Sequence, residues 1–323
     1  MRNRRRLPRT AATAVLVLLA LAACAFPPDG SSSIRFTTPL PLQAGQRHVY
    51  WADPTADWTP SDPIAGTATI GGANLDGTGM TAAAVTGLES PCGIAVNGTH
   101  LFWANRRQDS IGRANLDGSG LDNLFFRTPS GSYPCGVAID GDFIYWANHG
   151  YGASGTTIGR ATLDGGSVEG GFVRGALNPC GVAVDGEFLY WANEEGSSAS
   201  GGTIGRARLD GSDIEVDFIQ TDAVLPCGVA VDGSHVYWAN TAGGAIGRAR
   251  LDGSAVENRF IDGARWPCGV AADGDFIYWG NAGKYLDPSG PAAVGRARLD
   301  GSDVDQDWVT GMLGICGVAV DPN

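Results

Sequence analysis

From about residue 48 to residue 321 the chain alternates short apolar segments with polar turns. Segments such as residues 143–147 (FIYWA) and 180–184 (CGVAV) are short and end in Asp-Gly or glycine-rich turns. Short runs of β-branched and aromatic residues predict strands, because helices need longer periodic stretches. The 49 glycines agree with many tight turns. The pattern therefore predicts an all-β protein.

The same unit is repeated six times along this region, and a constant period of this length is typical of propellers and solenoids. A Cys-Gly-Val-Ala-Val-Asp element, with small variations, begins at Cys92, Cys135, Cys180, Cys227, Cys268 and Cys316, spaced 41 to 48 residues apart. An aromatic-Trp pair occurs at Tyr50-Trp51, Phe102-Trp103, Tyr145-Trp146, Tyr190-Trp191, Tyr237-Trp238 and Tyr278-Trp279. An Ile-Gly-Arg-Ala-x-Leu-Asp-Gly element occupies residues 111–118, 158–165, 204–211 and 246–253, with variants at 70–77 and 294–301.

Each unit contains four candidate strands: the Cys-Gly segment, the aromatic-Trp segment, the Ile-Gly-Arg-Ala segment and a variable apolar segment. Four such strands make one propeller blade, so the predicted fold is a six-bladed β-propeller. Small residues alternate along the first strand, which suits the crowded axis. The chain enters at a second strand, residues 48–53, and ends with a first strand, residues 316–321. We therefore expect the C-terminal strand to close the ring, which removes an open sheet edge.

The repeated unit resembles the YWTD propeller of the low-density lipoprotein receptor family. Residues 145–148 (YWAN) and 209–212 (LDGS), with their equivalents in the other units, carry the resemblance, which covers about residues 48–321. It implies a six-bladed propeller that binds a ligand or partner. The chain departs from the family pattern by having Asn in place of the motif Asp in five units and one cysteine per blade, and by lacking the flanking growth-factor modules.

The N-terminus has the pattern of a bacterial lipoprotein signal. Residues 1–23 combine an arginine-rich start with a short apolar stretch, too short to span a bilayer. The stretch ends in Leu-Ala-Ala before Cys24, which resembles a lipobox and predicts lipidation of Cys24. Residues 24–47 are expected to form a flexible tether, and residues 48–323 the propeller. Both Sec and twin-arginine export fit the basic start.

The two faces of the predicted ring differ in their connections. The loops after the aromatic-Trp segments vary in length, whereas the Asp-Gly turns opposite are short and repetitive. We call these the loop face and the turn face. Variable loops on a rigid scaffold commonly carry recognition, so we place the candidate binding site on the loop face. Its candidate residues are Trp58, Asp62, Arg106, Arg107, His149, Tyr151, Glu194, Glu195, Lys284, Tyr285 and Asp287.

The six propeller cysteines head the first strands and are expected to form a ring near the axis, at its loop-face end. Three interpretations stay open. Neighbouring blades could pair as Cys92-Cys135, Cys180-Cys227 and Cys268-Cys316, since exported domains usually oxidise even numbers of cysteines. The distance between neighbours in a six-fold ring argues against such pairing. The thiolates could hold a soft ion such as Cu(I), or all six could simply pack as buried thiols. We adopt packing and assign no metal or cofactor.

Little in the sequence indicates catalysis. Three of the four histidines fall in a repeat column that holds Phe elsewhere and are interpreted as structural: His48, His100 and His235. Only His149 remains, and no catalytic residue is assigned. Repeated aspartates and arginines are expected to serve turns and pairs within blades. A column of Asn105, Asn148, Asn193, Asn240 and Asn281 with Asp53 is the one polar set around the axis that could serve the alternative function, a lactonase- or lyase-type enzyme with an axial metal.

The predicted function is therefore a protein- or ligand-binding module at the cell envelope. The net charge is −12, and the basic residues 1–9 are part of the signal, so the folded part is strongly acidic. Such a surface repels nucleic acid and anionic lipid. We expect a monomer that contacts the membrane only through its lipid anchor, on the extracytoplasmic side, with an unknown protein or small envelope ligand as partner.

Overall fold

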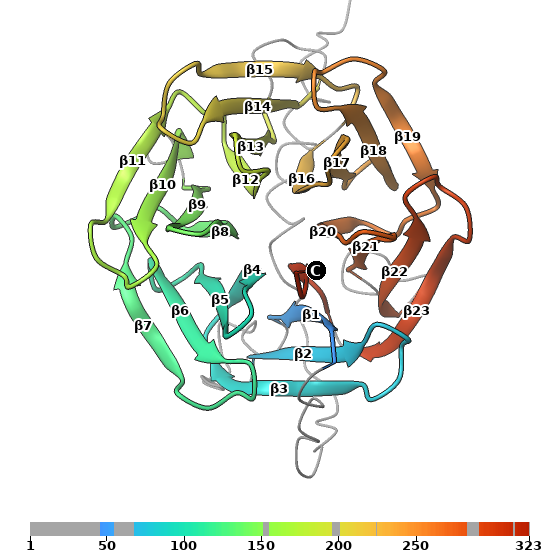
Figure 1. Cartoon of the computed structure of the whole chain (residues 1–323), viewed down its shortest axis with the longest axis horizontal. Coiled ribbons are helices and arrows are strands. Elements are labelled where there is room, and N and C mark those ends of the chain that lie inside the picture. Colours follow the sequence, from blue (N-terminus) through green and yellow to red (C-terminus); the bar gives the residue numbers. More distant parts are fainter. Residues whose placement is uncertain are drawn as a thin grey trace, which may run out of the picture.

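The computed structural model describes residues 46–54, 68–150, 155–195, 201–223, 225–282, 291–312 and 314–322. These residues form six four-stranded antiparallel sheets arranged as blades around a central axis (Figure 1). The all-β, six-bladed propeller predicted from the sequence is confirmed. The predicted signal, Cys24 and nearly all of the tether lie outside the described residues. Within the described part, no helix is long and apolar enough to cross a bilayer.

The four strands of each blade follow one another from the axis outward. The first blade contains β24 (Val318–Val320), β1 (His48–Asp53), β2 (Ala68–Asn74) and β3 (Thr81–Leu88), and the second contains β4 (Pro91–Val96), β5 (His100–Asn105), β6 (Ser110–Asn115) and β7 (Asp122–Arg127). The third contains β8 (Pro134–Ile139), β9 (Phe143–Asn148), β10 (Thr157–Thr162) and β11 (Glu169–Arg174), and the fourth contains β12 (Pro179–Val184), β13 (Phe188–Asn193), β14 (Thr203–Arg208) and β15 (Glu215–Gln220). The fifth contains β16 (Pro226–Val231), β17 (His235–Asn240), β18 (Ala245–Arg250) and β19 (Glu257–Asp262), and the sixth contains β20 (Pro267–Ala272), β21 (Phe276–Asn281), β22 (Ala292–Arg298) and β23 (Asp305–Met312).

The first blade is completed by the end of the chain, because β24 pairs antiparallel with β1. The amide of Asp321 donates to the carbonyl of His48, and the amide of His48 donates to the Asp321 carboxylate, both at 2.9 Å. In the fifth blade, Asp232 and His235 make the same two contacts across the β16–β17 turn. The first blade is thus built like the others, except that no turn connects its two inner strands, β24 and β1. The predicted closure is confirmed.

Asp321 gives this closure a pH dependence. Burial raises the pKa of its carboxyl, although hydrogen bonds from His48 and the charge of Arg47 oppose the rise. As pH rises from about 4 the unfolded chain releases this proton first, so the free energy of unfolding falls until the folded carboxyl also ionises. We expect Asp321→Asn to remove that decline. Urea unfolding of the wild type and of Asp321→Asn from about pH 3.5 to 7 gives their free energies of unfolding. A difference between the two free energies that stays constant with pH would contradict this prediction.

The core of each blade is a tryptophan packed over a glycine. In the fourth blade the Trp191 ring is fully buried, and a Cβ at Gly205 would overlap the indole. The Trp191 Nε1 donates to Asn193 Oδ1 at 2.9 Å, and Asn193 Nδ2 donates to the Val216 carbonyl in β15 at 2.8 Å. The second and third blades repeat both bonds through Asn105 and Asn148. In these three blades the asparagine therefore ties tryptophan to the outer strand, whereas in the sixth blade Trp279 Nε1 donates to Gln306 Oε1 and Asn281 donates to the Gln306 carbonyl.

Repeated arginines connect neighbouring blades. Arg206 of β14 contacts Glu215 in its own blade, stacks on Phe218 with its guanidinium carbon 3.7 Å from the ring centroid, and donates to the Leu251 carbonyl of the fifth blade at 3.3 Å. The equivalent links between blades are Arg160 to Leu209, Arg248 to Leu299 and Arg296 to Leu75. Pairing within blades is confirmed for Arg160, Arg206 and Arg248. The same side chains also join one blade to the next.

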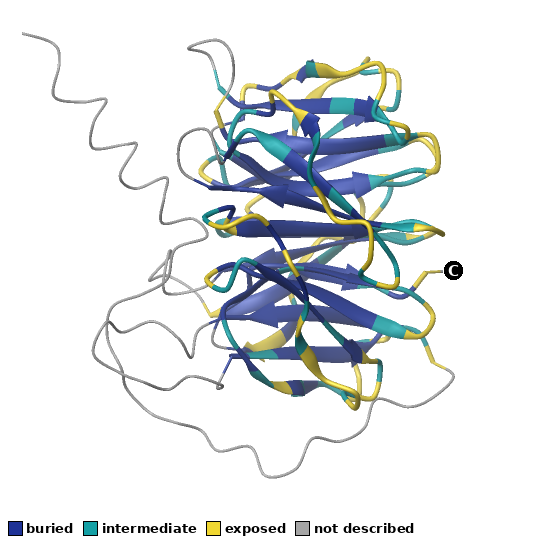
Figure 2. Ribbon diagram, turned by 90° about the vertical axis from the view of Figure 1, so that its left-hand side faces the viewer, coloured by how far each residue is buried: buried dark blue, intermediate teal, exposed yellow. Residues whose placement is uncertain are grey.

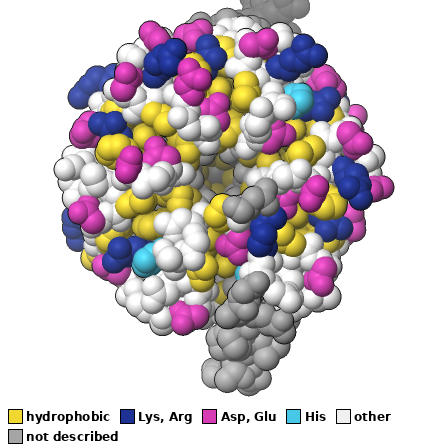
Figure 3. Space-filling model, viewed as in Figure 1, with side chains coloured by type: hydrophobic (Ala, Val, Ile, Leu, Met, Phe, Trp, Pro, Cys, Tyr) yellow, Lys and Arg dark blue, Asp and Glu magenta, His cyan; other side chains and the backbone are white. Residues whose placement is uncertain are grey.

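The turn face, which also holds the C-terminus, is built from short turns organised by aspartates (Figure 2). Asp140 accepts hydrogen bonds from the Phe143 amide and the Tyr145 hydroxyl. Burial, and then this carboxylate, raise the pKa of Tyr145 well above its ordinary value. The arrangement recurs at Asp185, Asp232 and Asp273. These aspartates are structural, as expected. Figure 3 looks onto this face and shows a hollow at its centre with hydrophobic side chains around it.

Candidate functional site at the axis

The innermost strands converge on a small axial cavity. It has a volume of about 50 Å³ and is lined by one cysteine, one glycine and one valine or isoleucine from each blade. This volume suits a few water molecules or an ion but not an organic substrate. Glycine is required beside each cysteine, because a Cβ at Gly181 would lie 2.8 Å from the Val229 nitrogen of the neighbouring strand. The axis is therefore packed backbone against backbone.

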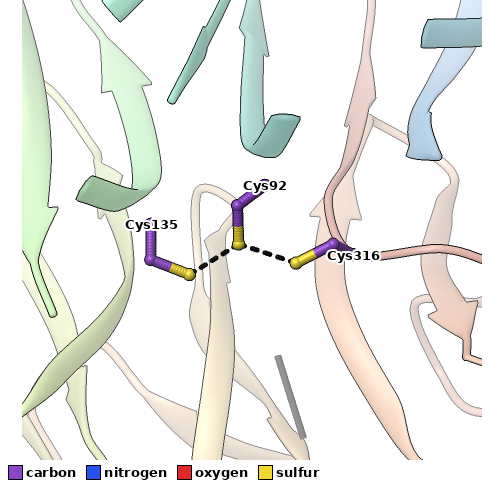
Figure 4. A group of neighbouring side chains, drawn as sticks. All are labelled: Cys92, Cys135 and Cys316. Atoms are coloured by element: carbon purple, nitrogen blue, oxygen red, sulfur yellow. Dashed lines mark hydrogen bonds between the residues drawn. The ribbon is translucent and has the colours of Figure 1, made fainter. Parts of the chain in front are cut away.

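The six cysteine sulfurs form a continuous ring around this axis, and all are buried. Cys92 Sγ lies 2.7 Å from the sulfurs of both Cys135 and Cys316 (Figure 4). Three further neighbour pairs lie 3.5 to 3.7 Å apart: Cys135 and Cys180, Cys227 and Cys268, and Cys268 and Cys316. A disulfide joins the sixth pair, Cys180 and Cys227.

The expectation that neighbouring cysteines lie too far apart for a disulfide is wrong, and the adopted packing of all six as thiols is wrong for Cys180 and Cys227, which are joined. The Cα atoms of Cys180 and Cys227 are 5.0 Å apart, inside the range that disulfides need. The reason is the glycine that follows each cysteine. Without side chains at these positions the six first strands approach closely, and the ring is narrower than a general six-fold propeller suggests.

Three of the predicted loop-face residues meet just above this ring. Arg106, His149 and Glu194 each follow the asparagine that ends the second strand of three consecutive blades: β5, β9 and β13. Arg106 Nη2 lies 2.9 Å from His149 Nδ1, and His149 Nε2 lies 3.0 Å from Glu194 Oε2. Their exposed fractions are 9%, 5% and 7%. We call these three residues the axial triad. Thr241 and Ala282 hold the same position in the next two blades.

The contacts of the axial triad determine where the His149 proton lies. Arginine is only a donor, so Arg106 donates to Nδ1 and the proton of neutral His149 sits on Nε2. Nε2 faces the Glu194 carboxylate but is not aligned with it as a hydrogen bond. Asn178 Nδ2 donates to the same carboxylate oxygen at 3.1 Å. The triad is thus a buried charged chain with one N–H that lacks an aligned acceptor among the described residues.

A metal site at the axial triad is disfavoured. The ligand atoms of His149, Glu194 and Cys180 lie within 4.8 Å of one another. However, Arg106 places the proton on the nitrogen that would have to bind the metal. Cys180 is also held in a disulfide and offers no thiolate. The arrangement is suited to hydrogen bonding and charge recognition instead.

The remaining loop-face candidates fall into two groups. Arg107 and Glu195 lie one residue beyond the axial triad and are exposed. The other candidates, Trp58, Asp62, Tyr151, Lys284, Tyr285 and Asp287, lie outside the described residues. Five of the candidates lie among the described residues, and the structure brings three of these together, the axial triad.

One set of equivalent residues, at the loop-face end of the axis, was not singled out from the sequence. The residue before each Pro-Cys pair has a positive φ of 45° to 62°: Ser90, Tyr133, Asn178, Leu225 and Trp266. This conformation is uncommon without glycine. The backbone amides of Arg106 and Glu194 donate to the carbonyls of Ser90 and Asn178. The sequence feature that could have identified these residues is their constant position in the repeat, immediately before Pro-Cys.

Comparisons with known proteins agree with the fold. No known family profile and no curated protein sequence match the chain. The chain is similar to one in the crystal structure of a nidogen/laminin complex, with a TM-score of 0.66 and 19% identity over 85% of this chain and 98% of that one. It is also similar to streptogramin B lyase, with a TM-score of 0.54 and 17% identity over 84% of this chain and 91% of that one. These likenesses define the protein as a six-bladed β-propeller and, at such identities, show the fold alone.

Proposed function

We propose that this protein is an exported, lipid-anchored binding module that takes a protein or small ligand of the cell envelope at the loop-face end of its axis. The observation that carries the proposal is the axial triad. Most of the ring is six-fold repetitive and serves the scaffold. Arg106, His149 and Glu194 break this repetition, because they hold equivalent positions in three consecutive blades and so lie on one side of the axis. Buried, charged and polar side chains that converge at one end of the axis in this way are typical of a recognition site.

The enzyme alternative has less support. Its expected ligands were the asparagine column, and Asn105, Asn148 and Asn193 already use their side chains within their own blades. The axial cavity is too small for an organic substrate. The likeness to streptogramin B lyase reaches only the fold. Binding is therefore the function that we put forward.

The proposal is tested by photo-crosslinking of the full-length protein on intact cells. A photoreactive residue at Arg107, on the loop face, is expected to give an adduct with the partner. One at Ser119, an exposed turn-face position in the same blade, is expected to give none. Glu194→Gln should reduce the adduct about tenfold or more, because it removes a buried charge of the triad. An exposed glutamate on the turn face of the same blade provides the control, Glu187→Gln, which should leave the adduct unchanged.

A small ligand would instead appear in native mass spectra of the mature protein and disappear in Glu194→Gln. The anchor is tested in the same cells, where Cys24→Ala should move the protein from the membrane to the soluble extracytoplasmic fraction. Equal adducts from both faces would contradict the proposed site. The proposed site would also be contradicted if neither a crosslinked adduct nor a bound ligand mass is lost in Glu194→Gln.

A further inference from the structure

The disulfide in the sulfur ring limits how the other four cysteines can pair. Cys180 and Cys227 are joined, and the six sulfurs together form one buried cluster. Cys92 lies equally close to two ring neighbours, with its sulfur 2.7 Å from the sulfurs of both Cys135 and Cys316 (Figure 4). The distance alone therefore does not choose a partner for Cys92.

The geometry of a closed ring makes this choice. Six positions in a ring can be divided into neighbouring pairs in only two ways, and each bond belongs to one of the two divisions. The existing disulfide belongs to the division that also pairs Cys92 with Cys135 and Cys268 with Cys316. A bond from Cys92 to Cys316 belongs to the other division. Beside the existing disulfide, it would leave two cysteines on opposite sides of the ring, each between neighbours that are already joined.

The backbone spacing is equally suitable for the two further pairs. A Cβ added to the glycine after each cysteine would lie 2.6 to 3.0 Å from the glycine Cα of the next strand, at all six junctions between blades. This distance is 2.9 Å at the existing disulfide, and 2.6 Å and 2.8 Å at the two junctions to be joined. The Cα atoms of Cys180 and Cys227 are 5.0 Å apart, as a disulfide requires. Strands that approach as closely elsewhere meet the same requirement.

We propose that three disulfides close the ring, each between neighbouring blades: Cys92-Cys135, Cys180-Cys227 and Cys268-Cys316. Each bond forms between two sulfurs as two thiols give up two electrons and two protons. These pass to the disulfide of an envelope dithiol–disulfide oxidoreductase, which is reduced to two thiols. In this respect the inference rests on the proposed function, because disulfides persist in exported proteins.

These bonds would join the blades in pairs and fasten the closure of the ring. The link from Cys268 to Cys316 connects the sixth blade to the segment that leads into β24, which completes the first blade. The link from Cys92 to Cys135 connects the second and third blades, which carry two members of the axial triad. Their sequence separations are 48 and 43 residues. Bonds across such long loops exclude many expanded states of the unfolded chain.

The test maps the disulfides of the full-length protein after all thiols are blocked at lysis. An arginine or a lysine stands between every two consecutive cysteines of the ring, so trypsin places each cysteine in a separate peptide. We expect three linked pairs of peptides that correspond to the three proposed disulfides. No cysteine of the ring should carry the blocking reagent.

A second sample separates the pairing from the export on which it depends. The same protein is unfolded, reduced and refolded with reduced and oxidised glutathione, which replaces the cellular oxidant. The same three links are expected. A protein that is reduced in cells but refolds with these links would contradict export and support the pairing. A refolded protein that keeps a reactive thiol in the ring, or links Cys92 to Cys316, overturns the proposal.

Two double variants provide a matched comparison. Cys92→Ser with Cys135→Ser removes one proposed disulfide and should leave no reactive ring thiol after denaturation. Cys92→Ser with Cys180→Ser removes one member from each of two pairs and should expose two thiols. The first variant should melt about 5 to 15 °C below the wild type, the usual loss for one disulfide in a domain of this size. Two reactive thiols in the first variant would overturn the proposal, and the wild-type maps remain decisive if a variant does not fold.

Discussion

Removal of residues 314–323 abolishes the cooperative unfolding transition of the propeller. The deleted segment contributes Ile315, Val318 and Ala319 to the core, with exposed fractions of 4%, 5% and 7%. A fully buried valine or isoleucine contributes about 1.5–3 kcal/mol, and domains are stable by only about 5–15 kcal/mol in total. The deletion also leaves β1 as an open edge beside the axis. Thermal unfolding by circular dichroism and calorimetry measures the effect.

The control for this deletion restores the strand at the other end of the chain. In a circular permutant, Asp321 is joined to His48 through Gly-Ser, which reproduces the turn from Asp232 to His235, and new termini are opened at Gly141 and Asp142. This protein should unfold cooperatively, at or above the midpoint of the parent. A truncated protein that melts as the intact one does would refute the role of β24 in closing the ring.

Gly228→Ala destabilises the propeller by about 3 kcal/mol, near the upper end of the usual cost of overpacking. Gly228 lies in β16 beside the axis, and a Cβ there would lie 2.6 Å from the Val270 nitrogen and would overlap the Cys268 carbonyl. Both obstacles are backbone atoms of the neighbouring blade. They cannot rotate away as a side chain would, so the strands must separate. Chemical denaturation gives the change in unfolding free energy.

Gly233→Ala is the matched substitution, five residues further along the same blade. A Cβ at Gly233 meets nothing within 4 Å, and Gly233 is not among the glycines with a left-handed backbone. We expect a change between zero and a stabilisation of about 1 kcal/mol, because alanine restricts the unfolded chain. Equal effects at the two positions would show that the axis is not packed backbone against backbone.

The candidate site shows where reasoning from the sequence was sufficient and where it was not. Arg106, His149 and Glu194 were selected with the other loop-face residues because variable loops on a rigid scaffold commonly carry recognition, and the structure brings these three together. The sequence did not separate them from Arg107 and Glu195, which differ only by one residue along the chain. That single step decides between facing the axis and facing solvent, because the asparagine before each triad residue is tied inside its blade.

The amino-acid sequence by itself determined the all-β class, the six blades and the closure of the ring. These features can be predicted because the motifs repeat, and each repeated unit must bury its apolar face against the next. Only the tertiary structure decided the radius of the cysteine ring and the partners of the repeated arginines. Both depend on how closely neighbouring blades approach. That distance is set by contacts between backbones, such as those at Gly181 and Gly228, and no local pattern of residue types records it.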